Sequence, residues 1–464
     1  MPLVFIFYWL LKRWSIRCQN LLLLVASYFF YGCWDWRFLG LIAFSSAVDY
    51  CIGIRLEATE EAESRKRWLW CSVVLNLGVL GFFKYYGFFV ESFVAAMQSL
   101  GIQANIPALK IILPVGISFY TFQSLSYTID VYRRQIRATH DVIAFFTFLS
   151  FFPQLVAGPI ERASHLLPQF LTPRNFDYRL AKDGLRQILW GLFKKIVIAD
   201  NLAGLVDNIF VNYRDYGASV LCLGALYFAI QIYCDFSGYS DIAIGSARLF
   251  GFDLTRNFAY PYFSRDIGEF WRRWHISLST WFRDYVYIPL GGSRGGRRWK
   301  HFSVLLITFV VSGFWHGANW TFVVWGFLHA LFYLPLVISN RHKRNQETVA
   351  QGRWLPTLRE TLQMSVTFTL TSLAWVFFRA DSLAHATDYL FRIATSEWTM
   401  PQMLRGLPYV AVLLVAEWIQ REKGHALAIE SASPVTRWMV YYGVIICIFL
   451  FGNTGNVPFI YFQF

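Results

Sequence analysis

Long apolar runs alternate with short polar stretches along nearly the whole chain. A helix needs about 20 residues to cross the hydrocarbon core of a bilayer, and several runs are shorter or are interrupted by Gly and Pro. We therefore expect about 9–12 runs to span a membrane and the others to be re-entrant or interfacial. The candidate segments are residues 20–32, 38–54, 68–90, 108–127, 142–157, 186–206, 218–234, 303–320, 321–339, 362–379, 407–419 and 436–452.

Composition supports this pattern. Of the 464 residues, 56% are hydrophobic and only 15% are charged, whereas soluble domains carry about 25% charged residues. The sequence predicts an all-α polytopic membrane protein. Because it shows no internal repeat and no low-complexity linker, we expect a single domain over residues 1–464. The seven Cys form no CxxC pair and have no metal-like spacing with His, so neither a metal site nor a disulfide framework is expected.

The net charge of +13 is gathered in clusters between the apolar runs. In membrane proteins Lys and Arg accumulate in cytoplasmic loops, so the charge does not indicate a nucleic-acid partner. The positive-inside rule places five clusters in the cytoplasm. They are Lys12-Arg13-Arg17, Arg65-Lys66-Arg67, Arg133-Arg134-Arg137, Arg294-Arg297-Arg298-Lys300 and Arg341-Lys343-Arg344.

A helical hairpin is expected over residues 302–340, with its tip near residues 317–319. His316 would lie about 24 Å along the helix from Lys300, deep in the membrane. A histidine there is costly unless it faces a cavity or a partner. Taken alone, His316 is as consistent with a packed histidine bonded to a carbonyl as with a catalytic residue. Gly313 and Gly317 would leave room for close helix approach or for passage of a substrate.

The densest polar stretch is residues 253–300, where charged side chains and His275 lie among tryptophans and tyrosines. Such a stretch cannot face lipid. We expect amphipathic or re-entrant helices that are buried in protein or line a wet cavity. Helical spacing would place Arg272, His275 and Ser279 on one face, and Trp271, Trp274 and Leu278 on another.

Two further polar islands interrupt apolar runs. Residues 231–245, QIYCDFSGYSDIAIG, contain Asp235, Ser237 and Tyr239, and residues 150–162 read SFFPQLVAGPIER. Gly and Pro at membrane depth predict broken helices around a cavity in both islands.

Together these stretches resemble one known family. The motifs are FPQLVAGPIER, QIYCDFSGYSDIAIG, NFAYPYFSRDIGEFWRRWHISLSTWFRDYVYIPLGG, GFWHGANWTFVVWGFLHA and the closing PFIYFQF. They are similar to the membrane-bound O-acyltransferase superfamily, in particular to its bacterial alginate O-acetylase branch. The long motif is the most specific of them, and the likeness covers residues 20–464.

The resemblance implies a ring of transmembrane helices around a thin core, with a tunnel from the cytoplasm and an outward-facing funnel. It implies an acyl thioester donor, a hydroxyl acceptor and catalysis by the histidine of the WHG motif, His316. His316 would act as general base, because the pKa of imidazole lies near neutrality. An acyl-histidine intermediate is a less favoured variant.

The histidine of the RRWH motif, His275, would orient His316 or stabilise the developing oxyanion together with Asn319 or a tryptophan N–H. A structural role, with a hydrogen bond to Asp235 or Asp241, is nearly as well supported. His329 is expected to be a core histidine. Residues expected to bind substrate or to support the site are Asn319, Trp315, Trp271, Trp274, Arg272, Arg273, Asp235, Ser237 and Tyr239.

Arg272 and Arg273 would suit the phosphates of an acyl donor. Ion pairs with Glu269, Asp266 or Asp284 are the preferred interpretation of both arginines. The basic loop GGSRGGRRWK is likewise expected to be a cytoplasmic loop rather than a phosphate site.

The resulting hypothesis is a multi-pass O-acetyltransferase of the bacterial inner membrane that modifies an exported polysaccharide. Acetyl-CoA or an acyl-carrier phosphopantetheine would be the co-substrate, with no permanently bound cofactor. Membrane lipid and a periplasmic acetyltransferase would be partners. There are two alternatives: a transporter or channel, and a scaffold subunit without its own chemistry. A transporter would be expected to contain inverted repeats.

Overall fold

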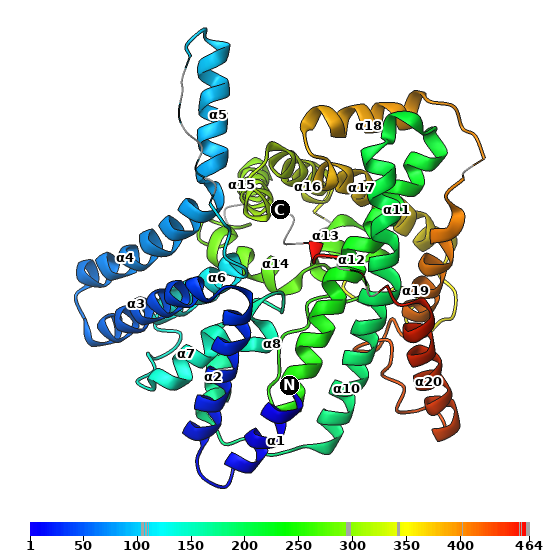
Figure 1. The fold of residues 1–464 in the computed structure, drawn as a ribbon. Coiled ribbons are helices and arrows are strands. Elements are labelled where there is room, and N and C mark those ends of the chain that lie inside the picture. The colour runs from blue at the N-terminus through cyan, green and yellow to red at the C-terminus, as the bar shows by residue number, and fades with distance from the viewer. Residues whose placement is uncertain are drawn as a thin grey trace. The chain divides into compact units, whose positions relative to one another are not determined.

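In the computed structural model, every regular element of the described residues is a helix (Figure 1). The structure describes residues 1–103, 106, 109, 111–293, 298–340, 344–400, 402–453, 455 and 457–460. The predicted all-α class is confirmed. Within these residues, six helices are long and apolar enough to cross a membrane. They are Ile16–Ala58, Ala62–Ser99, Ala218–Leu249, Trp320–Ile338, Leu358–Arg379 and Pro434–Phe451, the first two being continuous helical stretches that are divided into shorter elements below. The ring of 9–12 spans stays a prediction.

The chain forms two compact units, so the expectation of one domain also stays a prediction. The first unit comprises Met1–Gly184 with Ser246–Thr255, and the second Leu185–Gly245 with Arg256–Phe464. The helices of the first unit are α1 (Pro2–Leu11), α2 (Ile16–Asp35), α3 (Leu39–Ala58), α4 (Ala62–Leu80), α5 (Tyr86–Ser99), α6 (Ile117–Tyr132), α7 (Val142–Ser150), α8 (Phe152–Leu155), α9 (Ala163–Leu171) and the start of α10 (Tyr178–Leu192).

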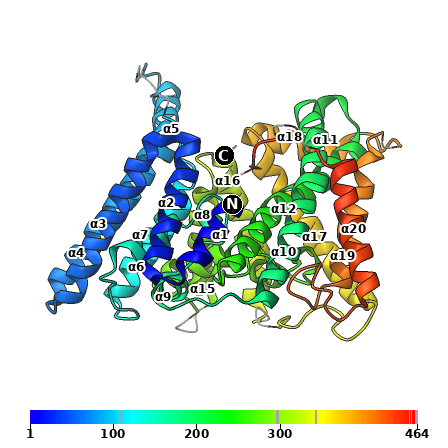
Figure 2. The same cartoon turned by 60° about the horizontal axis from the view of Figure 1, so that its bottom comes forward.

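In the first unit, α3 and α4 lie side by side (Figure 2) and both pack on α6. A buried polar network joins the three helices. The carboxylate of Asp49 accepts hydrogen bonds from Ser72 Oγ (2.6 Å), Asn76 Nδ2 (2.7 Å) and Ser124 Oγ. These donors compensate for removing the carboxylate from water.

Arg65 belongs to a cluster predicted to be a cytoplasmic loop, yet its side chain is buried. Its guanidinium donates to the carbonyls of Leu56 and Thr59 at the end of α3, and to those of Val131 and Tyr132 at the end of α6. The last carbonyls of a helix lack partners within the helix and carry partial negative charge. The guanidinium of Arg65 therefore caps the C-terminal ends of both α3 and α6.

The helix break predicted within residues 150–162 is confirmed, because α7 and α8 end and an irregular segment leads to α9. The buried Glu161 organises that segment. Its carboxylate accepts hydrogen bonds from the Thr255 backbone N–H (2.5 Å) and pairs with His165 Nδ1 (2.8 Å). His165 Nε2 lies 3.6 Å from Asp253.

The contacts of His165 with these carboxylates should make the stability of the fold depend on pH. Asp253 and Glu161 raise the pKa of His165 to about 10, from about 6.5 in an unfolded chain. Their stabilisation is complete below pH about 6.5 and is lost as the pH rises to about 10. The side chain is 41% exposed, which weakens the effect. We expect the melting temperature of the wild type to exceed that of His165→Gln at pH 6 and the difference to vanish near pH 10; a constant difference would contradict the assignment.

The second unit holds the polar stretch and the hairpin. Its helices are the end of α10, the π-helical η3 (Phe193–Ala199), α11 (Asp200–Val211), α12 (Ala218–Leu249) up to Gly245, α13 (Ile267–Arg273), α14 (Ile276–Phe282), the π-helical η6 (Arg283–Tyr287), α15 (Arg298–His316), α16 (Trp320–Ile338), α17 (Leu358–Arg379), α18 (Leu383–Thr395), α19 (Leu407–Ile419) and α20 (Pro434–Phe451). Helix α16 packs against α15, α17 and the short α13.

Candidate active site

The predicted hairpin is confirmed, and its tip is at residues 317–319 between α15 and α16. Two glycines allow the helices to touch. A Cβ atom on Gly313 would lie 2.2 Å from the Phe322 carbonyl oxygen, and one on Gly326 would lie 2.3 Å from the Phe309 carbonyl oxygen. The helices therefore cross backbone to backbone, which fixes the position of His316 at the end of α15.

Substitution at this crossing is expected to destabilise the hairpin. In Gly313→Ala, a methyl group would meet the backbone of α16 rather than a flexible side chain. Overpacking of this kind costs about 1–3 kcal/mol, so the melting temperature should fall. Gly443→Ala in α20 is the matched control, because nothing lies within 4 Å of the added Cβ. Equal melting temperatures for the two variants would contradict the crossing.

His316 lies in an aromatic enclosure and is 3% exposed. Its ring is 5.0 Å from that of Trp315, 5.2 Å from that of Trp325 and 5.3 Å from that of Phe378, centroid to centroid. All three rings present edge-to-face contacts. Such an enclosure excludes water and strengthens electrostatic interactions within it.

The structure brings His275 to this enclosure. The two imidazole centroids are 6.5 Å apart, and His275 is fully buried. The predicted helical face shared by Arg272, His275 and Ser279 is wrong. Helix α13 ends and α14 begins around His275, whose φ of +43° lies in the left-handed region. The helix is interrupted there, because the first amide of α14, Ile276 N, donates to Asn257 O (2.9 Å) and not to a carbonyl of α13.

Asn257 is the main support of His275 and was missed by sequence reasoning. Its Oδ1 lies 3.0 Å from His275 Nδ1 and accepts from Ser277 N (3.3 Å) and Oγ (3.0 Å), while its Nδ2 donates to Ser240 Oγ (3.1 Å). His275 therefore pairs with an amide, not with the predicted Asp235 or Asp241. The only signal in the sequence was the position of Asn257 within the NFAYPYFSRD motif.

Of the three candidate tryptophans, Trp315 is part of the enclosure, and Trp271 and Trp274 belong to the packing around it. Trp271 Nε1 donates to His329 Nδ1 (3.3 Å), and the Trp274 ring lies 4.9 Å from that of Trp375. His329 is fully buried. Asn319 caps α16 by accepting from Thr321 N (3.0 Å) and donates to the Asp381 carbonyl (3.1 Å). Both ends of its amide are thus used in structural bonds.

The preferred ion-pair interpretation is confirmed for Arg273, whose guanidinium lies 2.9 Å from Glu269. Glu269 also pairs with Arg265 at 3.0 Å. Arg272 donates to the Asn345 carbonyl (2.6 Å). The remaining part of the phosphate hypothesis, the basic loop at residues 294–297, lies outside the described residues, as do residues 341–343.

The predicted helix break at residues 231–245 is wrong, because α12 continues through Gly238. The glycine serves close packing instead. A Cβ on Gly238 would lie 2.8 Å from the Gly191 carbonyl oxygen, and one on Gly191 would lie 2.6 Å from the Gly238 carbonyl oxygen. Two helices far apart in sequence meet there, which no local pattern reveals.

The polar residues of α12 are paired with two lysines of η3. Lys195 Nζ lies 2.7 Å from both Asp235 Oδ1 and Asp200 Oδ1. Lys194 Nζ donates to Ser237 Oγ (2.8 Å) and lies 2.7 Å from Asp241 Oδ2. Sequence reasoning missed both lysines, although they stand in an otherwise apolar run, WGLFKKIVIA.

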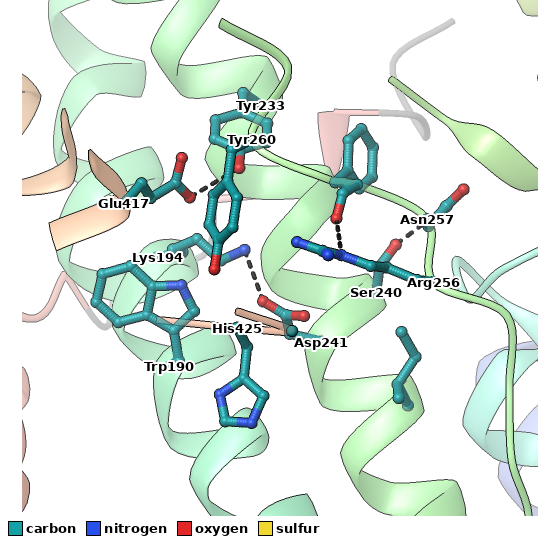
Figure 3. A pocket seen from close by; sticks show the side chains of 13 residues that line it. Trp190, Lys194, Tyr233, Ser240, Asp241, Arg256, Asn257, Tyr260, Glu417 and His425 are labelled. Atoms are coloured by element: carbon teal, nitrogen blue, oxygen red, sulfur yellow. Dashed lines mark hydrogen bonds and ion pairs between the residues drawn. The ribbon is translucent and has the colours of Figure 1, made fainter. Parts of the chain in front are cut away.

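A small polar cavity lies beside this cluster (Figure 3). Its volume of about 10 Å³ is close to the space of one water molecule. Asn257 forms part of its wall and therefore links it to His275. The lining residues are Trp190, Lys194, Tyr233, Ser240, Asp241, Ile244, Arg256, Asn257, Phe258, Tyr260, Glu417, Gly424 and His425.

The closing segment of the chain enters the same region. Ile460 N donates to Asp235 Oδ2 (2.7 Å), and the buried Phe459 ring lies 4.4 Å from that of Tyr239. Phe236, the neighbour of Asp235, lies 4.6 Å from His275. The paired carboxylate, the closing segment and the histidine are thereby joined in one packed region. Residues 461–464 of the PFIYFQF motif lie outside the described part of the chain.

Known proteins are similar to this chain in sequence. The family model described as "MBOAT, membrane-bound O-acyltransferase family" matches residues 131–354, a range that contains His275 and His316. The protein named "Probable alginate O-acetylase AlgI" of Azotobacter vinelandii is 42% identical over 83% of this chain and 75% of its own length. The chain belongs to the membrane-bound O-acyltransferase family. It is a multi-pass membrane O-acyltransferase.

Two other relatives of this acyltransferase span most of its length. The protein of the same name from Pseudomonas putida is 37% identical over 97% of this chain and 95% of its own length. "Peptidoglycan O-acetyltransferase" of Helicobacter pylori is 35% identical over 84% and 77%. Both names describe acetyl transfer, and the second names a glycan of the cell wall.

Proposed function

We propose that this acyltransferase moves an acetyl group from a thioester donor, acetyl-CoA or an acyl carrier, to a hydroxyl of an exported polysaccharide. The names of its relatives support acetyl as the group and a glycan as the acceptor. The basic clusters support a donor entrance on the cytoplasmic side of the inner membrane. A periplasmic acetyltransferase would complete the transfer to the glycan where the two act together.

One observation carries the chemistry: two buried histidines from separate elements lie 6.5 Å apart in an aromatic enclosure. In the proposed reaction, an imidazole nitrogen of His316 takes the proton of the attacking hydroxyl. The hydroxyl oxygen forms a bond to the thioester carbonyl carbon, the C–S bond breaks, and the leaving thiolate takes the proton from His316. The aromatic walls exclude water that would otherwise hydrolyse the thioester.

The two other classes of function make different predictions for one experiment. Purified protein in proteoliposomes receives acetyl-CoA labelled in its acetyl group, with an alginate oligosaccharide or a muropeptide as acceptor. Ester-linked label on an acceptor, with release of free CoA, supports the proposal. Label that crosses the membrane still bound to CoA would indicate a transporter. Absence of covalent transfer, with and without a periplasmic acetyltransferase, would indicate a scaffold.

A further inference from the structure

Among the described residues, His275 is hydrogen-bonded through one of its two ring nitrogens. Its Nδ1 lies 3.0 Å from Asn257 Oδ1, whereas its Nε2 is buried and makes no hydrogen bond to any residue that the structure describes. The ring itself is fully buried, with Phe236 4.6 Å away. A charged imidazolium in such surroundings would be costly, so the ring is neutral and only one of its nitrogens carries a hydrogen.

The backbone decides which nitrogen that is. Ser277 N can only donate, and it points at the side-chain amide of Asn257. The atom facing it must therefore be the oxygen, and the amide nitrogen faces Ser240 Oγ, which accepts. Because the oxygen of Asn257 also faces His275, the hydrogen of the imidazole must lie on Nδ1.

We propose that Asn257 is a positioning residue that holds His275 in the Nδ1–H tautomer, so that Nε2 faces the reaction centre as a hydrogen-bond acceptor. This inference rests on the proposed function. A bare Nε2 accepts from an N–H or O–H donor, either the imidazole of His316 or the attacking hydroxyl. Nε2 without a hydrogen cannot donate to an oxyanion. Of the two chemical roles considered for His275, the structure therefore favours the one in which His275 accepts a hydrogen bond over stabilisation of the oxyanion.

The choice of an amide has a consequence for pH dependence. Asn257 orients the ring without adding charge. A carboxylate at the same place would keep the Nδ1–H tautomer but would also stabilise the imidazolium. Since an acceptor must be unprotonated, the acid limb of the pH–rate profile should move to higher pH in Asn257→Asp. In Asn257→Leu, transfer should fall by about 10²-fold, mainly in kcat.

The direct test is ¹⁵N solid-state NMR of histidine-labelled protein in lipid, with His275→Gln used to assign the His275 signals. We expect a protonated Nδ1 and a bare Nε2 in the wild type and in Asn257→Asp. We expect the same in Ser240→Ala, the matched control, which removes only the partner of the amide nitrogen. In Asn257→Leu the two tautomers should mix.

A wild-type signal with the hydrogen on Nε2 would overturn the inference, and so would an unchanged tautomer in Asn257→Leu. If the leucine variant fails to fold, the pH–rate profile of Asn257→Asp decides, and an unshifted acid limb would count against the inference. The tautomer is measured without turnover. A wild-type protein with the expected tautomer but no covalent transfer would therefore refute the proposed function and not the role of Asn257.

Discussion

Acetyl transfer by His316→Ala is expected to be about 10²–10⁴-fold slower than by the wild type, the range that a positioned general base contributes. The reason is local. The imidazole ends α15 inside an enclosure of Trp315, Trp325 and Phe378, where bulk water cannot replace it as a base. Loss of the base should lower kcat, since the side chain acts on the transition state more than on binding.

The measurement is ester formation on the acceptor by purified protein, alongside the melting temperature in detergent. His329→Gln is the matched control, because His329 is a buried histidine of the same hairpin and is bonded to Trp271. The control should retain most of its transfer. Near-normal transfer by a folded His316→Ala protein would remove His316 from the mechanism.

Replacing Lys195 by methionine is expected to lower the free energy of unfolding by about 3–5 kcal/mol, the cost of breaking a buried ion pair. Its ammonium lies 2.7 Å from both Asp200 and Asp235, and all three side chains are almost entirely buried. Without the lysine, two carboxylates remain close together with no cation between them. Asp235 would then no longer hold the backbone of Ile460 in the same geometry.

This effect is measured as the shift of the melting temperature, and it has an internal check. Adding Asp235→Asn to Lys195→Met should recover part of the stability, because one buried charge is removed. Lys423→Met is the control, since Lys423 is exposed and a surface substitution changes stability by about 0.5 kcal/mol or less. A Lys195→Met protein as stable as the control would show that the cluster does not stabilise the fold.

Much of the fold could be read from the sequence because apolar runs of membrane length encode helices directly. The segment predicted over residues 407–419 coincides with α19, and the segment over residues 362–379 lies within α17. The hairpin and its tip followed from the two apolar runs that lie between basic clusters. The polar stretch of residues 253–300 could be recognised as amphipathic or re-entrant helices, buried in protein or lining a wet cavity, because its charges exclude contact with lipid.

What could not be predicted depends on contacts between distant segments. The sequence predicts a helix break at Gly238 because its sequence neighbours do not show that α12 packs closely against Gly191 of α10 at this point. Nothing local shows that Asn257 would meet His275 or that η3 would supply the cation for Asp235. The helix break at His275 is of the same kind, since it is stabilised by a carbonyl from another segment.

The crossing at Gly313 and Gly326 also limits how the enzyme can open. At these two glycines the contact of α15 with α16 is backbone to backbone, so no side chain at those points can change rotamer to accommodate sliding, and a slip of one residue would bring Cβ atoms into the crossing. The hairpin should therefore move as one rigid body. Substrate entry would require displacement of the elements that face it, such as α13 or α17, while His316 keeps its place on the hairpin.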